Sequence, residues 1–256
     1  MMRIGSAIRR VLALALCVLL GCGAFAGCSQ VDDIVSNVTA AGVFPVEVNG
    51  VTISSRPSRV VVLSPSLADV ILALGCETQL AGASEGCTQS ALDELEKVSA
   101  DSVEAIQALQ PDLVLVDPNS SGAQSALEEA GVTVLSVEPA TDRSDFERLY
   151  SQVSSALLGG EAGYDEGIAT AQDIFITLDN INRIVPKDTI TTACYLYDLD
   201  GSAVTGDMFG STIMSYAGVT NVFESVEGGT YDFDTLEMSN PNVIFCAPGL
   251  KEEIKN

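Results

Sequence analysis

The chain has 256 residues, of which 47% are hydrophobic, and a formal net charge of −23. This length and composition suffice for one large or two modest α/β lobes with proper cores, so intrinsic disorder is not expected. A surface this acidic repels nucleic acid and anionic lipid and favours a basic protein partner. The chain has no histidine, which excludes a Ser-His-Asp relay and histidine-ligated metal centres.

Residues 1–27 are typical of an export signal. Three basic residues, Arg3, Arg9 and Arg10, precede a short apolar run over residues 11–20. This run is shorter than a membrane-spanning helix requires. Cleavage after residue 27 would remove three basic residues and no acidic ones, so the mature chain would be more acidic still.

Cys28 is the predicted lipidation site. The stretch Phe25-Ala26-Gly27-Cys28 resembles the lipobox at which bacterial lipoproteins are cleaved and acylated. A diacyl anchor on Cys28 would hold the protein on the extracytoplasmic side of the cell membrane, with residues 28–43 as a flexible tether. Two alternatives stay open: lipidation of Cys22 after Leu19-Leu20-Gly21, or an ordinary cleaved signal without lipidation.

Four further cysteines are expected to be unpaired. Cys76 and Cys87 are predicted near opposite ends of one strand, and Cys194 and Cys246 at different heights of two others. Both separations exceed what a disulfide allows, so all four are interpreted as mostly buried thiols.

Residues 44–142 are predicted to form the first α/β lobe. It begins with a β-hairpin over residues 44–53, because alternating residues flank Asn49-Gly50. Strand-like and helix-like segments then alternate, which predicts a parallel sheet with helices on both faces. The expected strands are residues 59–63, 80–83, 113–116 and 133–137, and the expected helices are residues 66–74, 101–109 and 121–130.

Residues 143–185 are predicted to be linker helices, interrupted at Gly159-Gly160, and residues 186–256 a second lobe. The helix over residues 161–185 would span about 37 Å, enough to join two lobes. The predicted fold class is therefore α/β, with two Rossmann-like lobes with central parallel sheets joined by one long α-helix and a second lobe that is small or incomplete. Its expected elements are a strand at 191–197, a helix at 211–217, a short segment at 221–223 and a last strand at 242–246.

Several stretches carry a family resemblance. They are residues 56–66 (RPSRVVVLSPS), 73–75 (ALG), 109–114 (LQPDLV), 218–223 (GVTNVF) and 239–244 (SNPNVI). In order and spacing they resemble the periplasmic solute-binding proteins of ABC importers for cobalamin, ferric siderophores and haem, over about residues 44–251. The resemblance implies a monomer, not an enzyme, that binds a small molecule between its lobes and delivers it to a permease with its ATPase.

The resemblance also implies one acidic docking residue for the permease on each lobe. Aligned by motif, these are Glu96 and Asp234, although the family usually has glutamate at the second position and Glu237 could substitute. The sequence departs from the family in two ways. Many relatives have a further βαβ segment after the strand that matches residues 242–246, and relatives that bind corrinoids often use a tryptophan, which this chain lacks.

A ligand site can be predicted from the fold class, because ligands of open parallel sheets bind beyond the carboxyl ends of the strands. The predicted rim contains acids but no lysine or arginine, which favours a cobalamin-like ligand or a neutral to cationic metal chelate over an acidic one. Arg143 is the basic residue that could overturn this. The predicted contacts are Ser64, Pro65, Ser66, Ser84, Glu85, Asp117, Asn119, Ser120, Tyr197, Asp198, Met208, Phe209 and Tyr231, with Glu138, Asp207 and Ala247-Pro248 nearby.

Enzyme activity is not expected. Residues 82–86 match the G-x-S-x-G pattern of a hydrolase nucleophile after a strand, but no histidine is available as its base. No phosphate-binding glycine motif begins a βα unit, so no nucleotide, resident cofactor or metal is expected. The alternative function is a surface lipoprotein that uses the same fold as a sensing or adhesion module without transport.

Overall fold

The structure, a computed structural model, describes residues 42–186, 190–247 and 250–254. The predicted export signal, Cys28, Cys22, nearly all of the tether and Pro248 lie outside the described residues. Among the residues that are described, no helix is both long enough and apolar enough to cross a membrane.

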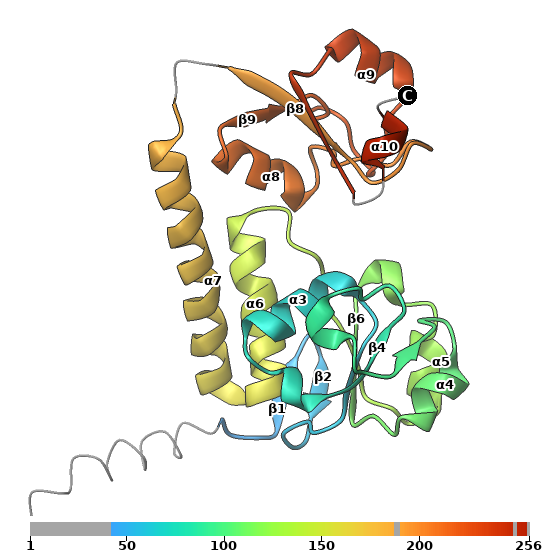
Figure 1. The fold of residues 1–256 in the computed structure, drawn as a ribbon. Coiled ribbons are helices and arrows are strands. Elements are labelled where there is room, and N and C mark those ends of the chain that lie inside the picture. Colours follow the sequence, from blue (N-terminus) through green and yellow to red (C-terminus); the bar gives the residue numbers. More distant parts are fainter. Residues whose placement is uncertain (1–41, 187–189, 248–249, 255–256) are drawn as a thin grey trace, which may run out of the picture. The chain divides into compact units, whose positions relative to one another are not determined.

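The first lobe contains a parallel sheet, part of which is labelled β4 and β6 in Figure 1. It has five strands in the order β5-β4-β3-β6-β7. Alternate residues of β3 point to opposite sides, so that Val60 and Val62 join one apolar cluster and Val61 the other. Helices α3 and α6 pack on the first side and α4 and α5 on the second, as the alternating pattern predicted. The elements are β3 Val60–Val62, α3 Pro65–Ala73, β4 Leu80–Ser84, β5 Lys97–Val98, α4 Val103–Ala108, β6 Leu113–Val116, α5 Gln124–Glu129 and β7 Val134–Ser136, with 3-10 turns at Glu77–Gln79, Ser90–Leu92 and Pro118–Ser120.

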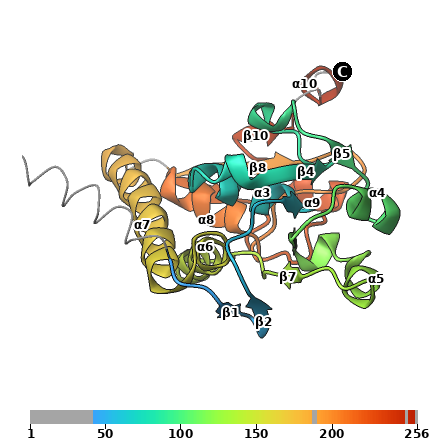
Figure 2. The same ribbon diagram turned by 90° about the horizontal axis from the view of Figure 1, so that it is seen from below.

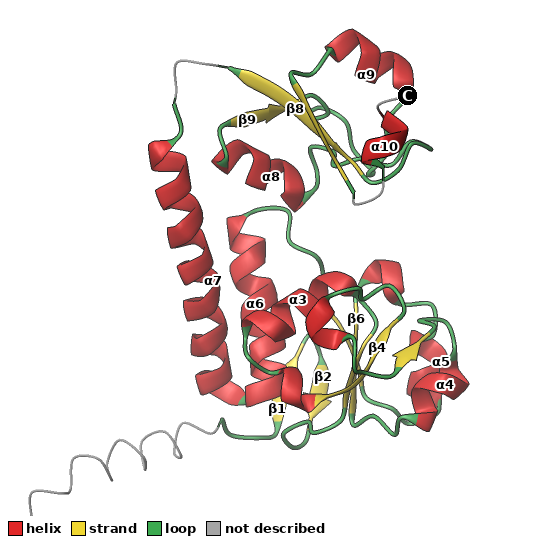
Figure 3. Cartoon of the chain, viewed as in Figure 1, coloured by secondary structure: helices red, strands yellow, loops and turns green. Residues whose placement is uncertain are grey.

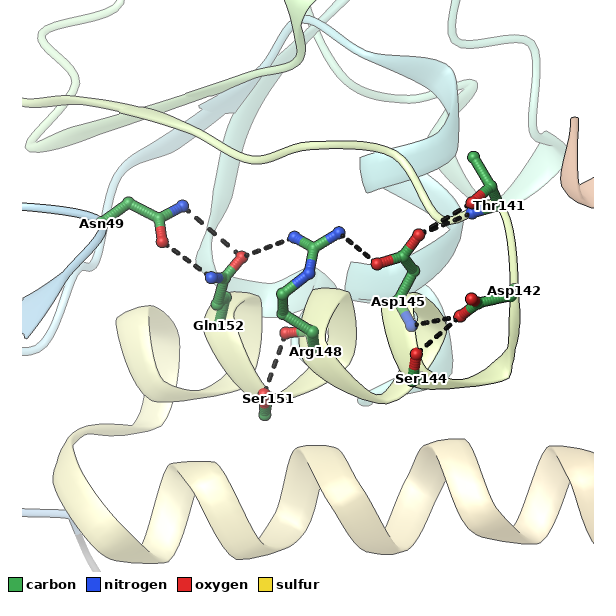
Figure 4. A network of polar contacts seen from close by, with 8 residues as sticks. All are labelled: Asn49, Thr141, Asp142, Ser144, Asp145, Arg148, Ser151 and Gln152. Atoms are coloured by element: carbon green, nitrogen blue, oxygen red, sulfur yellow. Dashed lines mark hydrogen bonds and ion pairs between the residues drawn. The ribbon is translucent and has the colours of Figure 1, made fainter. Parts of the chain in front are cut away.

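The predicted hairpin is confirmed as β1 (Val46–Val48) and β2 (Val51–Ile53). Asn49 and Gly50 have φ values of 49° and 78°, the positive values that a tight two-residue hairpin turn needs at both positions. The Asn49 side chain ties the turn to helix α6 (Arg143–Leu158), where it accepts a 2.7 Å hydrogen bond from Gln152 (Figure 4). The same polar row continues along α6 through Arg148, which donates to Asp145 at 3.1 Å.

Helices α6 and α7 (Gly160–Ile184) lie side by side in both ribbon views (Figures 1 and 2) and are separated by Gly159, as predicted. Two glycines of α7 make this contact possible. A Cβ atom on Gly163 would lie 2.6 Å from the carbonyl oxygen of Ser154, and one on Gly167 would lie 2.5 Å from that of Tyr150. Both distances are too short for any side chain, so the two helices pack backbone against backbone.

The second lobe has its own parallel three-stranded sheet, in the order β10-β8-β9, separate from the first (Figure 3). Two separate sheets confirm the predicted fold class. Two boundaries differ from the prediction: α8 begins at Phe209, and β9 ends at Asn221, whose side chain turns back to accept from the amide of Phe223. The elements are β8 Thr191–Leu196, α8 Phe209–Tyr216, β9 Val219–Asn221, α9 Phe233–Ser239, β10 Val243–Cys246 and α10 Lys251–Ile254.

The two lobes share an internal repeat that the sequence analysis did not anticipate. The strand order β4-β3-β6 of the first lobe recurs as β9-β8-β10 in the second. Helices α4 and α9 precede the matching strands β6 and β10, and their N-caps, Ser102 and Asp232, stand 130 residues apart. A left-handed residue before a proline follows each helix: Gln110 (φ 50°), just after Leu109, the C-cap of α4, and Asn240 (φ 41°), the C-cap of α9, again 130 residues apart.

The residue after each of these prolines forms hydrogen bonds that link the strand it precedes, β6 or β10, to the central strand beside it, β3 or β8. Asp112 accepts hydrogen bonds from the amide and hydroxyl of Ser58, at 2.8 and 3.0 Å, and from the amide of Arg59 at 3.0 Å. Asn242 accepts from the amide and hydroxyl of Thr192 at 2.9 and 3.0 Å. The same local device thus sets the register of the central strands in both lobes.

The cysteines are placed as predicted, with one difference. Cys76, Cys87 and Cys194 are buried, Cys246 is half-buried, and none of the four forms a disulfide among the described residues. Burial raises the pKa of the Cys194 thiol to about 11, so it stays protonated at neutral pH.

Candidate ligand-binding site

A groove of about 550 Å³ lies at the carboxyl ends of β3, β4, β5 and β6. It brings together seven of the eight contacts predicted on the first lobe, and the eighth, Ser64, is buried directly beneath. Hydroxyl and carboxyl groups dominate its polar lining. The lining residues are Leu63, Pro65, Ser66, Ser84, Glu85, Gly86, Ser99, Ala100, Asp101, Asp117, Asn119 and Ser120.

Asp117 shapes the groove floor. One carboxylate oxygen accepts from the amides of Asn119 and Ser120, both at 2.9 Å, and from the Ser120 hydroxyl at 3.0 Å. The other accepts from the hydroxyl of Ser64, which also lies 2.9 Å from that of Ser66. Because these bonds occupy the carboxylate, Asp117 holds the loops after β3 and β6 together at the groove floor.

Glu85 and Asp101 are the exposed acids of the groove. A Cβ atom on residue 122 would lie 2.1 Å from a carboxylate oxygen of Asp101. Glycine at position 122 therefore leaves room for this carboxylate. No lysine or arginine is among the described residues that line the groove. The ammonium group of nearby Lys97 donates to the carbonyl of Cys87 at 2.6 Å. The electrostatic potential in the groove therefore favours a neutral or cationic ligand.

The sequence analysis missed the part of the groove that follows β5. Ser99 and Asp101 line it because β5 brings the chain to the edge of the sheet. A strand of two residues has no detectable alternation, so the carboxyl-end rule could not be applied to it.

The G-x-S-x-G match at residues 82–86 has a packing explanation. A Cβ on Gly82 would lie 2.4 Å from a methyl carbon of Leu109, so glycine is needed for close packing. The Ser84 hydroxyl is buried and lies 3.3 Å from the sulfur of Cys87. Neither contact supplies the base that a nucleophilic serine requires.

Two of the contacts predicted on the second lobe lie just after β8. The Tyr197 side chain is 46% exposed and meets Tyr195 edge-on, with ring centroids 5.2 Å apart. The Asp198 carboxylate closes a turn by accepting from the amides of Asp200 and Ser202, both at 2.9 Å. Hydrogen bonds from Ser202 hold the pKa of Asp198 below its ordinary value, so the group is ionised at neutral pH.

The other three predicted contacts have packing partners. Phe209 stacks on Phe146 of α6, with ring centroids 4.8 Å apart, and Met208 packs against a small apolar cluster of the second lobe. Tyr231 stacks on Phe223 at 5.3 Å, and its hydroxyl has no hydrogen-bond partner among the described residues. Burial, aided by the charge of Asp198, raises the pKa of Tyr231, so this hydroxyl remains a proton donor.

Arg143, the cation that could have reversed the charge prediction, is neutralised by acidic partners. It lies 3.6 Å from the Glu147 carboxylate and 3.5 Å from that of Asp179. Its guanidinium group also lies over the ring of Phe175, 4.7 Å from the centroid. These contacts hold it against the linker helices.

The predicted docking acids lie on the surface of both lobes. Glu96 is exposed just before β5, a strand without counterpart among the described residues of the second lobe. Asp234 is exposed in the first turn of α9, and its partner in the internal repeat, 130 residues earlier, is Glu104 in the first turn of α4. Glu104 is also exposed. A repeat in the sequence itself, Gln-Pro-Asp and Asn-Pro-Asn, would have identified this pair.

Two α/β lobes joined by a helical hairpin, with a groove at the carboxyl ends of parallel strands, define a helix-linked binding protein. Residues 60–256 match the model of the periplasmic binding protein family, and the chain belongs to this family, as the sequence predicted. An uncharacterized ABC transporter substrate-binding lipoprotein of Bacillus subtilis strain 168, YvrC, is 34% identical over 164 residues. That match covers 59% of this chain and 49% of the relative, so it spans about half of that relative's length.

Solved structures of similar fold include a heme-binding protein, HmuT (TM-score 0.67, 18% identity, 82% of this chain and 75% of that one). An ABC-type Fe3+-hydroxamate transport protein from Saccharomonospora viridis has a TM-score of 0.63 at 21% identity, covering 80% of each chain. The vitamin B12 binding protein BtuF of Vibrio cholerae has a TM-score of 0.60 at 19% identity, covering 78% of this chain and 80% of that one. At these identities the likeness establishes the fold.

Proposed function

We propose that this protein is the extracytoplasmic solute-binding component of an ABC importer, which binds its ligand between the lobes and delivers it to the permease. The observation that carries the proposal is the groove at the carboxyl ends of β3, β4, β5 and β6, in a chain that belongs to the periplasmic binding protein family. Binding and release, without chemical change of the ligand, is the function that such a site supports.

The groove supports a cobalamin-like ligand or a neutral to cationic metal chelate. Its free acids are Glu85 and Asp101, and its exposed hydroxyls, those of Ser66 and Ser99, can donate to ligand oxygens without adding charge. From the second lobe, Tyr197, whose side chain is nearly half exposed, is the aromatic group we assign to ligand contact. Phe209 and Tyr231 are left to packing, because their rings stack on Phe146 and Phe223 and the Tyr231 hydroxyl is buried.

For the permease contact we assign Glu104 and Asp234. They are equivalent in the internal repeat, both are exposed, and among the described residues neither carboxylate has a hydrogen-bond or ion-pair partner. The earlier assignment of Glu96 rests on motif alignment alone. Lipidation of Cys28 would keep the protein, as a monomer, close to the permease and its ATPase.

Ligand binding can be tested by thermal unfolding with four probes: cyanocobalamin, a cationic ferric trihydroxamate, haemin and an anionic ferric tris-catecholate. A ligand that binds only the folded state adds about 2.7 kcal/mol of stability at a hundredfold excess over Kd. We expect stabilisation by cyanocobalamin or the cationic chelate. Asp101→Asn and Glu85→Gln should weaken binding of the cationic chelate, whereas the matched change Asp93→Asn, at an exposed acid outside the groove lining, should leave it unchanged.

Stabilisation by haemin or the tris-catecholate alone would contradict the proposed ligand charge. No stabilisation by any probe, together with the absence of permease and ATPase genes beside this one, would overturn the transport function in favour of a sensing or adhesion module.

A further inference from the structure

A second groove, of about 590 Å³, lies along helix α6, and residues of the hairpin and of α7 form its sides. It shares no lining residue with the groove at the carboxyl ends of the first sheet. Ser144, Arg148, Ser151 and Ser155 follow one another at intervals of three or four residues, which places them in one stripe along α6. This stripe is about 16 Å long, so the groove can hold an elongated small molecule.

The polar side chains along this α6 groove are held in place before any ligand arrives. Arg148 donates to the Asp145 carboxylate at 3.1 Å and to the amide oxygen of Gln152 at 3.5 Å (Figure 4). The Gln152 amide in turn exchanges hydrogen bonds with that of Asn49 in the hairpin turn, at 2.7 and 3.4 Å. Groups fixed in this way lose little conformational entropy when a ligand binds to them.

Ser155 lines the α6 groove with a hydroxyl that lacks a partner. The residue is only 8% exposed, yet its hydroxyl makes no hydrogen bond to any of the described residues. The hydroxyl of Ser151, also buried, differs because it donates to the carbonyl of Arg148 at 2.9 Å. A nearly buried hydroxyl without a partner is unfavourable. Because Ser155 lines the groove, a polar ligand atom bound there would supply the missing hydrogen bond.

The sides of the α6 groove combine an aromatic ring with free acids. Tyr164 of α7 is 52% exposed, and among the described residues its ring packs on no other aromatic ring. Glu47 of β1 and Glu161 of α7 are exposed, and neither carboxylate has a hydrogen-bond or ion-pair partner in the described part of the chain. The C–H groups of a sugar ring pack on an aromatic face, and its hydroxyls donate to carboxylates. This set of groups is therefore suited to a sugar.

We propose that the α6 groove is a second binding site, which takes a neutral carbohydrate of one or two rings. One sugar ring packs against Tyr164, and sugar hydroxyls donate to the carboxylates of Glu47 and Glu161. Arg148 and Ser155 donate to sugar oxygens from the side of α6. A polyamine would fit the two acids but is disfavoured, because the guanidinium group of Arg148 lies in the same groove and repels it. The site is separate from the proposed transport ligand and does not depend on it.

The test measures binding of maltose, N,N′-diacetylchitobiose and spermidine to the full chain by saturation-transfer NMR and calorimetry. We expect at least one of the two disaccharides to bind. Tyr164→Ala should weaken that binding about tenfold, whereas Tyr164→Phe, which keeps the ring, should retain it. Ser155→Ala should weaken it about fivefold. Ser154→Ala is the matched control, because the Ser154 hydroxyl is also buried without a partner but lies outside the groove lining, and the affinity should not change.

If a disaccharide binds the wild type, Tyr164→Ala and Ser155→Ala with the same Kd, the sugar occupies another place and the inference is wrong. Binding of spermidine without either disaccharide would replace the carbohydrate by a polyamine and also overturn it. Failure of all three probes to bind would show that the groove is not a carbohydrate site. None of these results bears on the transport ligand, which is tested separately with the four probes above. Circular dichroism shows that each variant is folded.

Discussion

The two lobes are built on the same three central strands but bury them to different extents. Every residue of β6, Leu113–Val116, is fully buried, whereas its counterparts Val243, Ile244 and Phe245 in β10 are 39%, 40% and 45% exposed. The local geometry is the same, with a capped helix, a left-handed residue, a proline and a strand. What differs is the packing on the two sides of the strand: β6 contributes to the apolar clusters on both faces of its sheet, whereas Val243, Ile244 and Phe245 belong to none of the apolar clusters of the described residues. The local sequence thus determines the conformation of each helix–strand segment. The elements that pack around the strand determine how much its burial contributes to stability.

The largest expected effect tests this difference at equivalent strand positions. Leu115→Ala removes a fully buried side chain from the first-lobe core and should lower the free energy of unfolding by about 3 kcal/mol. Phe245→Ala, at the matching position of β10, removes a larger side chain that is nearly half exposed, and should cost about 1 kcal/mol. Urea denaturation followed by circular dichroism measures both. Equal costs would show that the edge strand is buried in solution.

A smaller effect is expected for the residues that fasten the strands. Asp112→Ala removes an ionised acceptor of three hydrogen bonds and should cost about 2 kcal/mol. Asn242→Ala removes a neutral acceptor of two and should cost about 1 kcal/mol. Hydrogen exchange at the amides of Ser58 and Thr192 reports each loss locally. A larger cost at Asn242 would contradict the view that charge and bond number set the order.

Much of this fold could be predicted because its signals are local. Asn49-Gly50 specifies the hairpin turn, and Gly159-Gly160 marks the break between the linker helices. Helix α9 was missed: its seven residues cover barely two turns, too few for an apolar period to be evident. The cap of Asp232 on Thr235 was the available signal.

The candidate site was predictable where it depends on topology. The serines at 64 and 66 and the loop at 117–120 follow uniformly apolar strands, so their place at the carboxyl end of the sheet could be inferred. The packing of Phe209 on Phe146 depends on contacts between distant segments, which periodicity does not reveal. The assignment of Glu104 needed the repeat, which became evident from the matching left-handed residues.

The smallest expected effect concerns those left-handed residues. A side chain with a Cβ is strained at positive φ, and asparagine tolerates this conformation better than glutamine does. Gln110→Asn gives the first lobe the residue of the second and should raise the free energy of unfolding by about 0.5 kcal/mol, whereas Asn240→Gln should lower it by about as much. Gln107→Asn, inside α4, is the control and should be slightly destabilising, because asparagine is the poorer helix former. Changes of the same sign at 110 and 240 would mean that the backbone conformation does not govern these positions, and that the two lobes differ even where their geometry coincides.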